Sequence, residues 1–114
     1  YIHDPLTQLG MTTHGYEALV ERFDALGYPW LAFGGGGYDL DAVPRCWALA
    51  YGIMLGRRWP DVLPSGAQAF LVSEALRDGA VTVGNASLTK ASAWAEEKIK
   101  ELKRLIFPLH GLDS

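Results

Sequence analysis

The chain is poor in features that mark several large classes of protein. Cys46 is its single cysteine, which excludes an intrachain disulfide and a zinc site built on paired cysteines. No stretch approaches the ~18 consecutive apolar residues of a membrane span, and the first residues do not form a charged region followed by an apolar run. We therefore expect a cytoplasmic protein with no membrane partner, in which Cys46 is a small buried residue of a helix.

Positive charge is also scarce. The 10 Lys and Arg residues are outnumbered by 13 Asp and Glu, which gives a formal net charge of -3. Proteins that bind nucleic acids or anionic membranes usually carry a basic excess, so we expect no nucleic-acid partner. A hydrophobic content of 49% against 20% charged residues indicates a folded chain. At 114 residues it is expected to form a single segment, 1–114, with one core.

Apolar residues at helical spacing predict two helices in the first half of the chain. The first is expected to begin at the N-cap Thr12 and to end at Gly27, which would adopt a left-handed conformation. The second is expected to follow a cap at Asp39 or Asp41 and to close at Gly56. It is apolar nearly all round, which is typical of a core helix.

The second half predicts a weaker helix over 67–77 and a long one from the N-cap Ser87 to a stop at Pro108. One face of the long helix is apolar and the other carries opposite charges three and four residues apart, which is typical of a solvated face. Residues 78–83 are expected to form a turn and a short strand.

Residues 28–33 form a short apolar run without alternation, typical of a strand buried on both faces of a parallel sheet. Such a strand needs neighbours for its backbone hydrogen bonds, and the chain offers only the weak strand at 78–83. We therefore expect an α/β segment, mostly helical with one or two strands. Its exposed edge would be covered by the rest of a larger domain or by self-association.

Four consecutive glycines, Gly34 to Gly37, follow the predicted strand. Folded proteins keep such a run where the backbone must adopt positive φ or where another group comes very close, and ligands of open α/β sheets bind at the carboxyl ends of strands. A loop at which a ligand approaches is the leading interpretation, and a flexible turn is the alternative. A phosphate-binding loop is disfavoured, because the P-loop motif is absent and Asp39 would repel phosphate.

The chain resembles a known enzyme family at two runs, LAFGGGGYDL at 31–40 and VPRCW at 43–47. They are similar to the C-terminal part of the zinc-dependent deacetylases, which comprise the histone deacetylases and, most closely here, the bacterial acetoin-utilization deacetylases. The resemblance is strongest over 1–56, nearly absent over the variable residues 57–85, and moderate over the last helix and tail, 86–114.

The resemblance implies the C-terminal part of an arginase/deacetylase-type parallel α/β fold, in a domain larger than this chain. In that family a zinc ion held by two aspartates and a histidine polarises the acetamide carbonyl and its attacking water, and a histidine pair transfers protons. By resemblance, Tyr38 donates a hydrogen bond to the oxyanion, and Gly35 and Gly36 line the narrow acyl pocket. The substrate of the whole enzyme would be an acetyl-lysine or an acetylated amine.

The resemblance also implies that the histidine pair and the zinc ligands lie upstream of the matching region, the second metal aspartate falling just before Tyr1. Asp4 is expected to be structural. His3, His14 and His110 are too widely spaced for a metal site, although a weak composite site of His3, Asp4 and His110 is an alternative. We expect no metal ligand and no cofactor in this chain, and no activity without the N-terminal half of the domain. A non-catalytic, self-associating interaction module is the competing interpretation.

Overall fold

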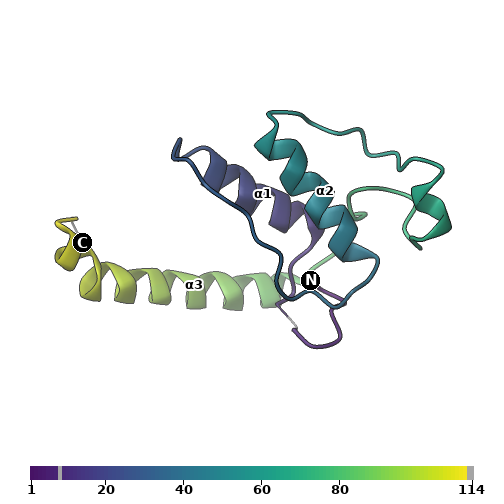
Figure 1. Cartoon of the computed structure of the whole chain (residues 1–114). Coiled ribbons are helices and arrows are strands. Elements are labelled where there is room, and N and C mark those ends of the chain that lie inside the picture. The colour runs from purple at the N-terminus through teal and green to yellow at the C-terminus, as the bar shows by residue number, and fades with distance from the viewer. Residues whose placement is uncertain (8, 113–114) are drawn as a thin grey trace. The chain divides into compact units, whose positions relative to one another are not determined.

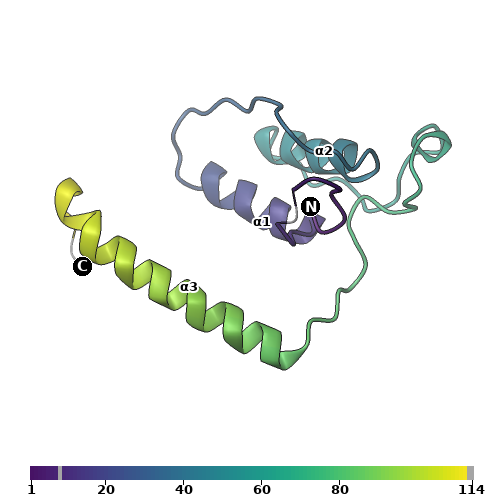
Figure 2. The same ribbon diagram turned by 90° about the horizontal axis from the view of Figure 1, so that it is seen from below.

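The computed structural model describes residues 1–7 and 9–112, which contain three α-helices and two short 3-10 helices (Figure 1). In chain order these are α1 (Thr13–Asp24), α2 (Ala42–Met54), η1 (Ala67–Ala69), α3 (Asn85–Leu105) and η2 (Phe107–His110). The chain divides into two compact units, Tyr1–Gly79 and Ala80–Ser114. The glycine loop, Gly34–Gly37, lies in the first unit, where α1 and α2 pack side by side (Figure 2).

Helix α1 begins where its sequence predicts. The hydroxyl oxygen of Thr12 accepts a hydrogen bond from the backbone N–H of Gly15 at 3.2 Å, so the predicted N-cap is confirmed. Arg22 lies in the last turn, where a positive charge is favourable. Gly27 adopts a φ of 71° after the helix ends, as expected for a residue that reverses the chain out of a helix.

Helix α2 is capped by the side chain of Asp39. Its Oδ1 accepts hydrogen bonds from the backbone N–H groups of Asp41 at 3.0 Å and Ala42 at 2.8 Å, which are unpaired donors at the start of the helix. Asp41 occupies the N-cap position but makes no capping bond. Of the two candidate caps, Asp39 is therefore the one that supplies the bonds. The helix ends at Met54, and Gly56 then has a φ of 62°.

The apolar core of the first unit is small. It is formed by Leu49 of α2 with Leu63 and Leu76 from the irregular chain that follows. Trp59 packs against this cluster and donates its indole N–H to the carbonyl of Ala48 at 2.9 Å. Residues 57–79 thus cover one side of α2 without regular structure apart from η1 and a single antiparallel bridge.

Residues 28–33 do not form the predicted β-strand. They are extended, and Leu31 and Phe33 are 80% and 84% exposed. A strand needs a hydrogen-bonded neighbour, and the described residues place none beside this run. Nor do residues 78–83 form a strand within the described chain. The mostly helical character is confirmed, the expected one or two strands are not, and the parallel α/β architecture stays a prediction.

The predicted helix over 67–77 is wrong beyond η1 at its start. The backbone N–H groups of Val72 and Ser73 donate instead to the carboxylate of Asp41, at 2.7 Å and 2.9 Å. Because these donors are bound to a side chain of α2, they are not available to an i to i−4 helical ladder. The contact with Asp41 therefore overrides the helix propensity of these residues.

The second unit is the long helix α3 followed by η2. Helix α3 follows Gly84, so Ser87 lies inside its first turn and is not its N-cap. Lys98 and Glu101 form an i,i+3 ion pair at 2.8 Å on the charged face. The helix ends at Leu105, before Pro108, as predicted. Among the described residues, no helix combines the length and the apolar character that a membrane crossing requires.

Gly52 gives a direct test of how α2 packs. A Cβ there would lie 2.6 Å from Nε1 of Trp59 and 2.9 Å from the carbonyl oxygen of Arg57. Overpacking of this kind costs about 1–3 kcal/mol, so Gly52→Ala should lower the free energy of unfolding by that amount in urea titrations. Gly66→Ala is the control, because nothing lies within 4 Å of its Cβ position. Equal stability of the two variants would contradict the packing described here.

Candidate functional site

The glycine loop, Gly34–Gly37, joins the extended residues 28–33 to the start of α2. Gly36 and Gly37 have φ values of 74° and 88°, a region that residues with a side chain rarely adopt. A Cβ on Gly37 would also lie 2.8 Å from Cγ2 of Val43. Backbone conformation therefore requires two of the four glycines, and packing against α2 adds a second requirement at Gly37.

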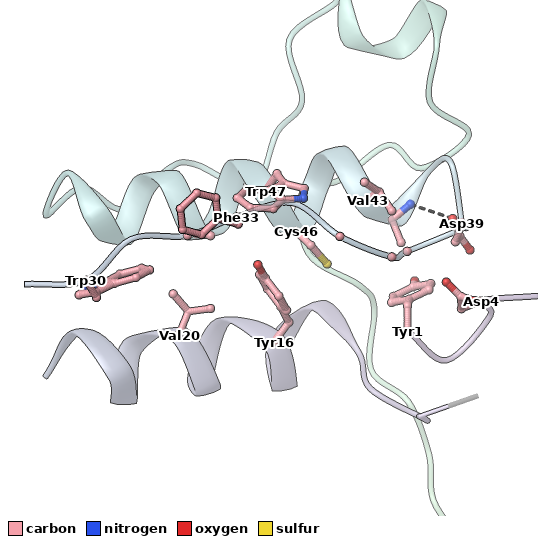
Figure 3. Close-up of a pocket in the computed structure, with 16 residues that line it drawn as sticks. Tyr1, Asp4, Tyr16, Val20, Trp30, Phe33, Asp39, Val43, Cys46 and Trp47 are labelled. Atoms are coloured by element: carbon pink, nitrogen blue, oxygen red, sulfur yellow. Dashed lines mark hydrogen bonds between the residues drawn. The ribbon is translucent and has the colours of Figure 1, made fainter. Parts of the chain in front are cut away.

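The loop borders a cavity of about 360 Å³ in the first unit (Figure 3). Side chains of α1 and α2 face each other across it, and most of the lining is apolar. Gly35 and Gly36 are among the lining residues, so the absence of side chains there leaves space in the cavity. The lining comprises Tyr1, Asp4, Tyr16, Val20, Trp30, Ala32, Phe33, Gly35, Gly36, Gly37, Asp39, Ala42, Val43, Cys46, Trp47 and Ala50.

Burial changes the chemistry of two side chains in this lining. It raises the pKa of the Cys46 thiol and also that of the Tyr16 phenol, because both charged forms are disfavoured away from water. Cys46 lies in α2, as predicted, but it is half-buried and not fully buried. Neither group is prepared to act as an anion near neutral pH.

Tyr38 is held by its backbone and not by its ring. Its backbone N–H donates to Oδ2 of Asp4 at 2.7 Å. Its side chain is not part of the cavity lining, the residue is 52% exposed, and the described residues show no hydrogen bond to its hydroxyl. The structure thus fixes the backbone from which the phenol extends and leaves the residue half-exposed.

Both carboxylate oxygens of Asp4 accept hydrogen bonds from backbone N–H groups. Oδ1 accepts from the N–H groups of Leu6 at 2.9 Å and Thr7 at 2.8 Å, and Oδ2 accepts from Tyr38. Asp4 is buried, 4% exposed. The hydrogen bonds from Thr7, Tyr38 and Leu6 lower the pKa of Asp4 to about 2, because they favour the charged form. Asp4 is therefore a structural carboxylate, as its sequence context predicts.

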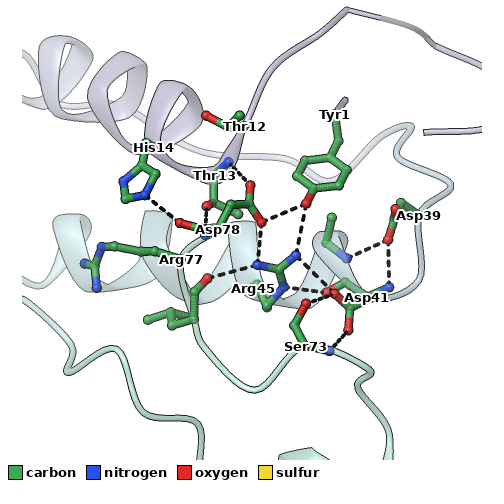
Figure 4. Close-up of polar contacts among 12 residues, drawn as sticks. Tyr1, Thr12, Thr13, His14, Asp39, Asp41, Arg45, Ser73, Arg77 and Asp78 are labelled. Atoms are coloured by element: carbon green, nitrogen blue, oxygen red, sulfur yellow. Dashed lines mark hydrogen bonds and ion pairs between the residues drawn. The ribbon is translucent and has the colours of Figure 1, made fainter. Parts of the chain in front are cut away.

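Arg45 is the centre of a buried polar network (Figure 4). Its Nη1 lies 2.9 Å from Oδ1 of Asp78, and its Nη2 lies 3.0 Å from Oδ2 of Asp41 and 3.2 Å from the hydroxyl of Tyr1. Arg45 is 2% exposed. Burial alone would lower the pKa of the guanidinium, but the bonds to Asp78 and Tyr1 raise it, so Arg45 stays charged.

Asp78 extends this network to the start of α1. Its Oδ2 accepts from the backbone N–H of Thr13 at 2.7 Å, its Oδ1 accepts from the hydroxyl of Tyr1 at 2.7 Å, and its own N–H donates to the Thr13 hydroxyl. Burial alone would raise the pKa of Asp78, but the hydrogen bonds from Thr13, Tyr1 and Arg45 lower it to about 2. The local sequence does not predict these contacts, because the bonded residues lie 33 to 77 positions apart in the chain.

The side chains that the structure describes do not fit a zinc ion. Residues 1–7 and 9–112 form no group of three or more His, Cys, Asp or Glu side chains that could hold a metal. His3 packs its ring edge-on to Tyr1, and His14 bonds through Nε2 to the carbonyl of Asp78 at 2.8 Å. Asp4 already accepts three hydrogen bonds from backbone N–H groups, and it is not grouped with His3 and His110 in a metal-binding cluster.

Comparison with known proteins matches part of this chain to one family. Over 61 residues, 54% of the chain, it is 41% identical to "Putative histone deacetylase 2" of Caenorhabditis elegans and 33% identical to "Histone deacetylase 1" of Oryza sativa subsp. japonica. Over 42% of the chain it is 43% identical to the acetoin utilization protein AcuC of Bacillus subtilis. The chain is a partial match to the deacetylase family.

The match covers a small part of each relative. The aligned stretch is 12% of each histone deacetylase and 14% of AcuC, so the chain matches only about one eighth of these relatives. No protein-family model and no solved structure matches the chain. The family resemblance seen in the sequence is confirmed over about half of the chain, and the roles of Tyr38, Gly35 and Gly36 stay predictions.

The low pKa of Asp78 predicts acid sensitivity of the first unit. The pKa is about 2 in the folded chain and about 3.9 in an unfolded one. The stability that depends on this charge is therefore fully present above pH about 4 and is lost as the pH falls through about 2. We expect the urea midpoint to be nearly constant from about pH 7 to 5 and to fall below about pH 4.

The variant Asp78→Asn separates the contribution of the Asp78 charge from that of the other carboxylates. The variant should have a lower urea midpoint at neutral pH, because Arg45 loses one of its two charged partners, and it should lose less stability than the wild type on acidification. Asp24→Asn, which removes a carboxylate outside the network, should keep the wild-type decline. A midpoint of Asp78→Asn that runs parallel to the wild type at every pH would contradict the assignment.

Proposed function

We propose that this chain contributes the glycine loop and the oxyanion-stabilising tyrosine of a deacetylase-like amide hydrolase. The observation that carries the proposal is the arrangement at Tyr38, whose backbone N–H is bound by a buried carboxylate while the residue is half-exposed. The partial match to histone deacetylases and AcuC supports it. The substrate would be an acetyl-lysine or an acetylated amine, and the other half of the domain would be its partner.

Amide hydrolysis creates a negative charge that Tyr38 is suited to stabilise. When water adds to the acetamide carbonyl, the carbonyl oxygen becomes an oxyanion, and the intermediate then breaks to acetate and an amine. A phenol donates a hydrogen bond to this oxygen without adding a charge of its own. Gly35 and Gly36 would accommodate the acetyl methyl group, because a loop without side chains allows close approach to its backbone.

The metal chemistry of the family belongs to groups outside this chain. In the family that the sequence resembles, zinc polarises the substrate carbonyl and the attacking water. The described side chains here do not fit that ion, so we assign them no metal-dependent step. We accordingly propose that the chain alone has no deacetylase activity.

A chimera tests the proposal without requiring activity from the isolated chain. Residues 1–56, where the resemblance is strongest, would replace the corresponding segment of AcuC, and hydrolysis of an acetyl-lysine peptide would be measured. We expect an active chimera in which Tyr38→Phe lowers kcat by about 10²- to 10³-fold, the usual effect of losing one oxyanion donor. Tyr51→Phe is the matched control, because Tyr51 is exposed on α2 and does not line the cavity.

Two results would contradict the proposal. One is a chimera that retains zinc and the circular dichroism of a folded protein but has no activity. The other is a chimera in which Tyr38→Phe and Tyr51→Phe have the same kcat. In either case the loop does not supply the oxyanion donor.

A second candidate is a non-catalytic module that associates with a second copy of itself. The extended run at 28–33 favours it, since Leu31 and Phe33 are exposed and an unpaired extended backbone can accept a further strand. A sedimentation coefficient typical of a monomer at micromolar concentration would exclude it.

A further inference from the structure

The contact between Asp4 and Tyr38 joins two segments that are 34 residues apart. Asp4 lies beside Tyr1, at the end of the cavity where the glycine loop leads towards α2 (Figure 3). Its carboxylate cannot rotate without losing bonds, because Oδ1 is held by Leu6 and Thr7 while Oδ2 holds Tyr38. A buried carboxylate with three N–H donors is thus a rigid support for the backbone of Tyr38.

The loop needs such a support. It contains four consecutive glycines, two of them with positive φ, and glycine has the largest backbone freedom of any residue. The described residues show no backbone hydrogen bond from the extended run and loop, 28–37. The N–H of Tyr38 is therefore where the chain, after ten residues without such a bond, is fixed again before the Asp39 cap of α2.

Asp4 is itself fixed to the body of the first unit. The backbone N–H of Asp4 donates to the carbonyl of Tyr1 at 3.1 Å, and Ile2 donates to the carbonyl of Met11 at 2.8 Å. The Tyr1 hydroxyl is held in turn by Asp78 and Arg45. A continuous set of hydrogen bonds therefore connects the buried ion pair to the backbone of Tyr38.

We propose that Asp4 is a positioning residue that fixes the backbone of Tyr38, and through it the direction in which the phenol is presented to the substrate. The role in catalysis rests on the function proposed above, whereas the anchoring of the loop does not. A carboxylate is required because it accepts hydrogen bonds at both oxygens. An asparagine has one amide oxygen, which would satisfy two donors at Leu6 and Thr7 but only one at Tyr38, so its NH2 group would face the Tyr38 N–H.

Amide hydrogen exchange measured by NMR on this chain tests the anchor alone. The N–H of Tyr38 should be protected in the wild type and should exchange at least about tenfold faster in Asp4→Asn, the scale of losing a hydrogen bond to a charged group. Asp24→Asn is the control, because its carboxylate accepts from the indole of Trp30 and makes no contact with the Tyr38 backbone. The amides of α2 report whether each variant keeps its fold.

A second variant covers the case in which Asp4→Asn also loses protection in α2. Asp4→Ser keeps a hydroxyl that can accept from the local turn at Leu6 and Thr7, but it lacks the second oxygen that reaches Tyr38. We expect Asp4→Ser to leave α2 protected and to release the Tyr38 amide. Protection of Tyr38 that persists in a folded Asp4→Ser or Asp4→Asn variant overturns the anchor.

The AcuC chimera tests the link from the anchor to catalysis. Asp4→Asn should lower kcat by at least about tenfold with little change in KM, because it displaces a group that acts in the transition state. The double variant Asp4→Asn/Tyr38→Phe should be no slower than Tyr38→Phe alone, since Asp4 acts through the phenol. A merely structural role would instead add its own loss to that of Tyr38→Phe.

The outcomes separate the two proposals. If Asp4→Asn releases the Tyr38 amide but leaves kcat unchanged while Tyr38→Phe is slow, the positioning role is overturned and the proposed function stands. If Tyr38→Phe itself has no effect, the proposed function fails, and the positioning role fails with it. Independent, additive losses in the double variant also overturn the positioning role.

Discussion

The buried ion pair between Arg45 and Asp78 is the interaction on which the first unit depends. Its apolar core is small, built around Leu49, Leu63 and Leu76, and hydrophobic burial alone contributes little in so small a cluster. Arg45 and Asp78 join α2 to the end of the loop that covers it, and through Tyr1 to the N-terminal residues. Loss of Asp78 would leave Arg45 with Asp41 as its remaining charged partner, and breaking a buried ion pair is destabilising, so the network contributes to holding these segments together.

The arrangement of the glycine loop follows from this network. Tyr1 is fixed by Arg45 and Asp78, the turn that contains Asp4 follows Tyr1, and Asp4 holds the backbone of Tyr38. These polar contacts thus anchor one end of the glycine loop, whose residues have no side chains that could pack. The result is a half-exposed tyrosine on an anchored backbone, which supports the hydrogen-bond donor role proposed for Tyr38.

Local sequence predicted what local interactions determine. Helices α1 and α2 were recoverable from apolar spacing and from the caps at Thr12 and Asp39, and the GGGGY run pointed to the family that the comparisons support over part of the chain. Residues 28–33 and 67–77 were mispredicted because tertiary contacts decide their structure. The first run has no strand partner among the described residues, and the second gives its backbone donors to Asp41.

The links from Arg45 to Asp78 and from Asp4 to Tyr38 could not be read from the sequence, because residues more than 30 positions apart have no periodic signal. Our central proposal is that this chain carries the loop and tyrosine of a deacetylase-like site but not its metal ligands. Zinc per purified chain, measured by elemental analysis after dialysis against a weak chelator, tests that claim most directly. We predict a value close to zero, and one zinc ion bound per chain would contradict the account.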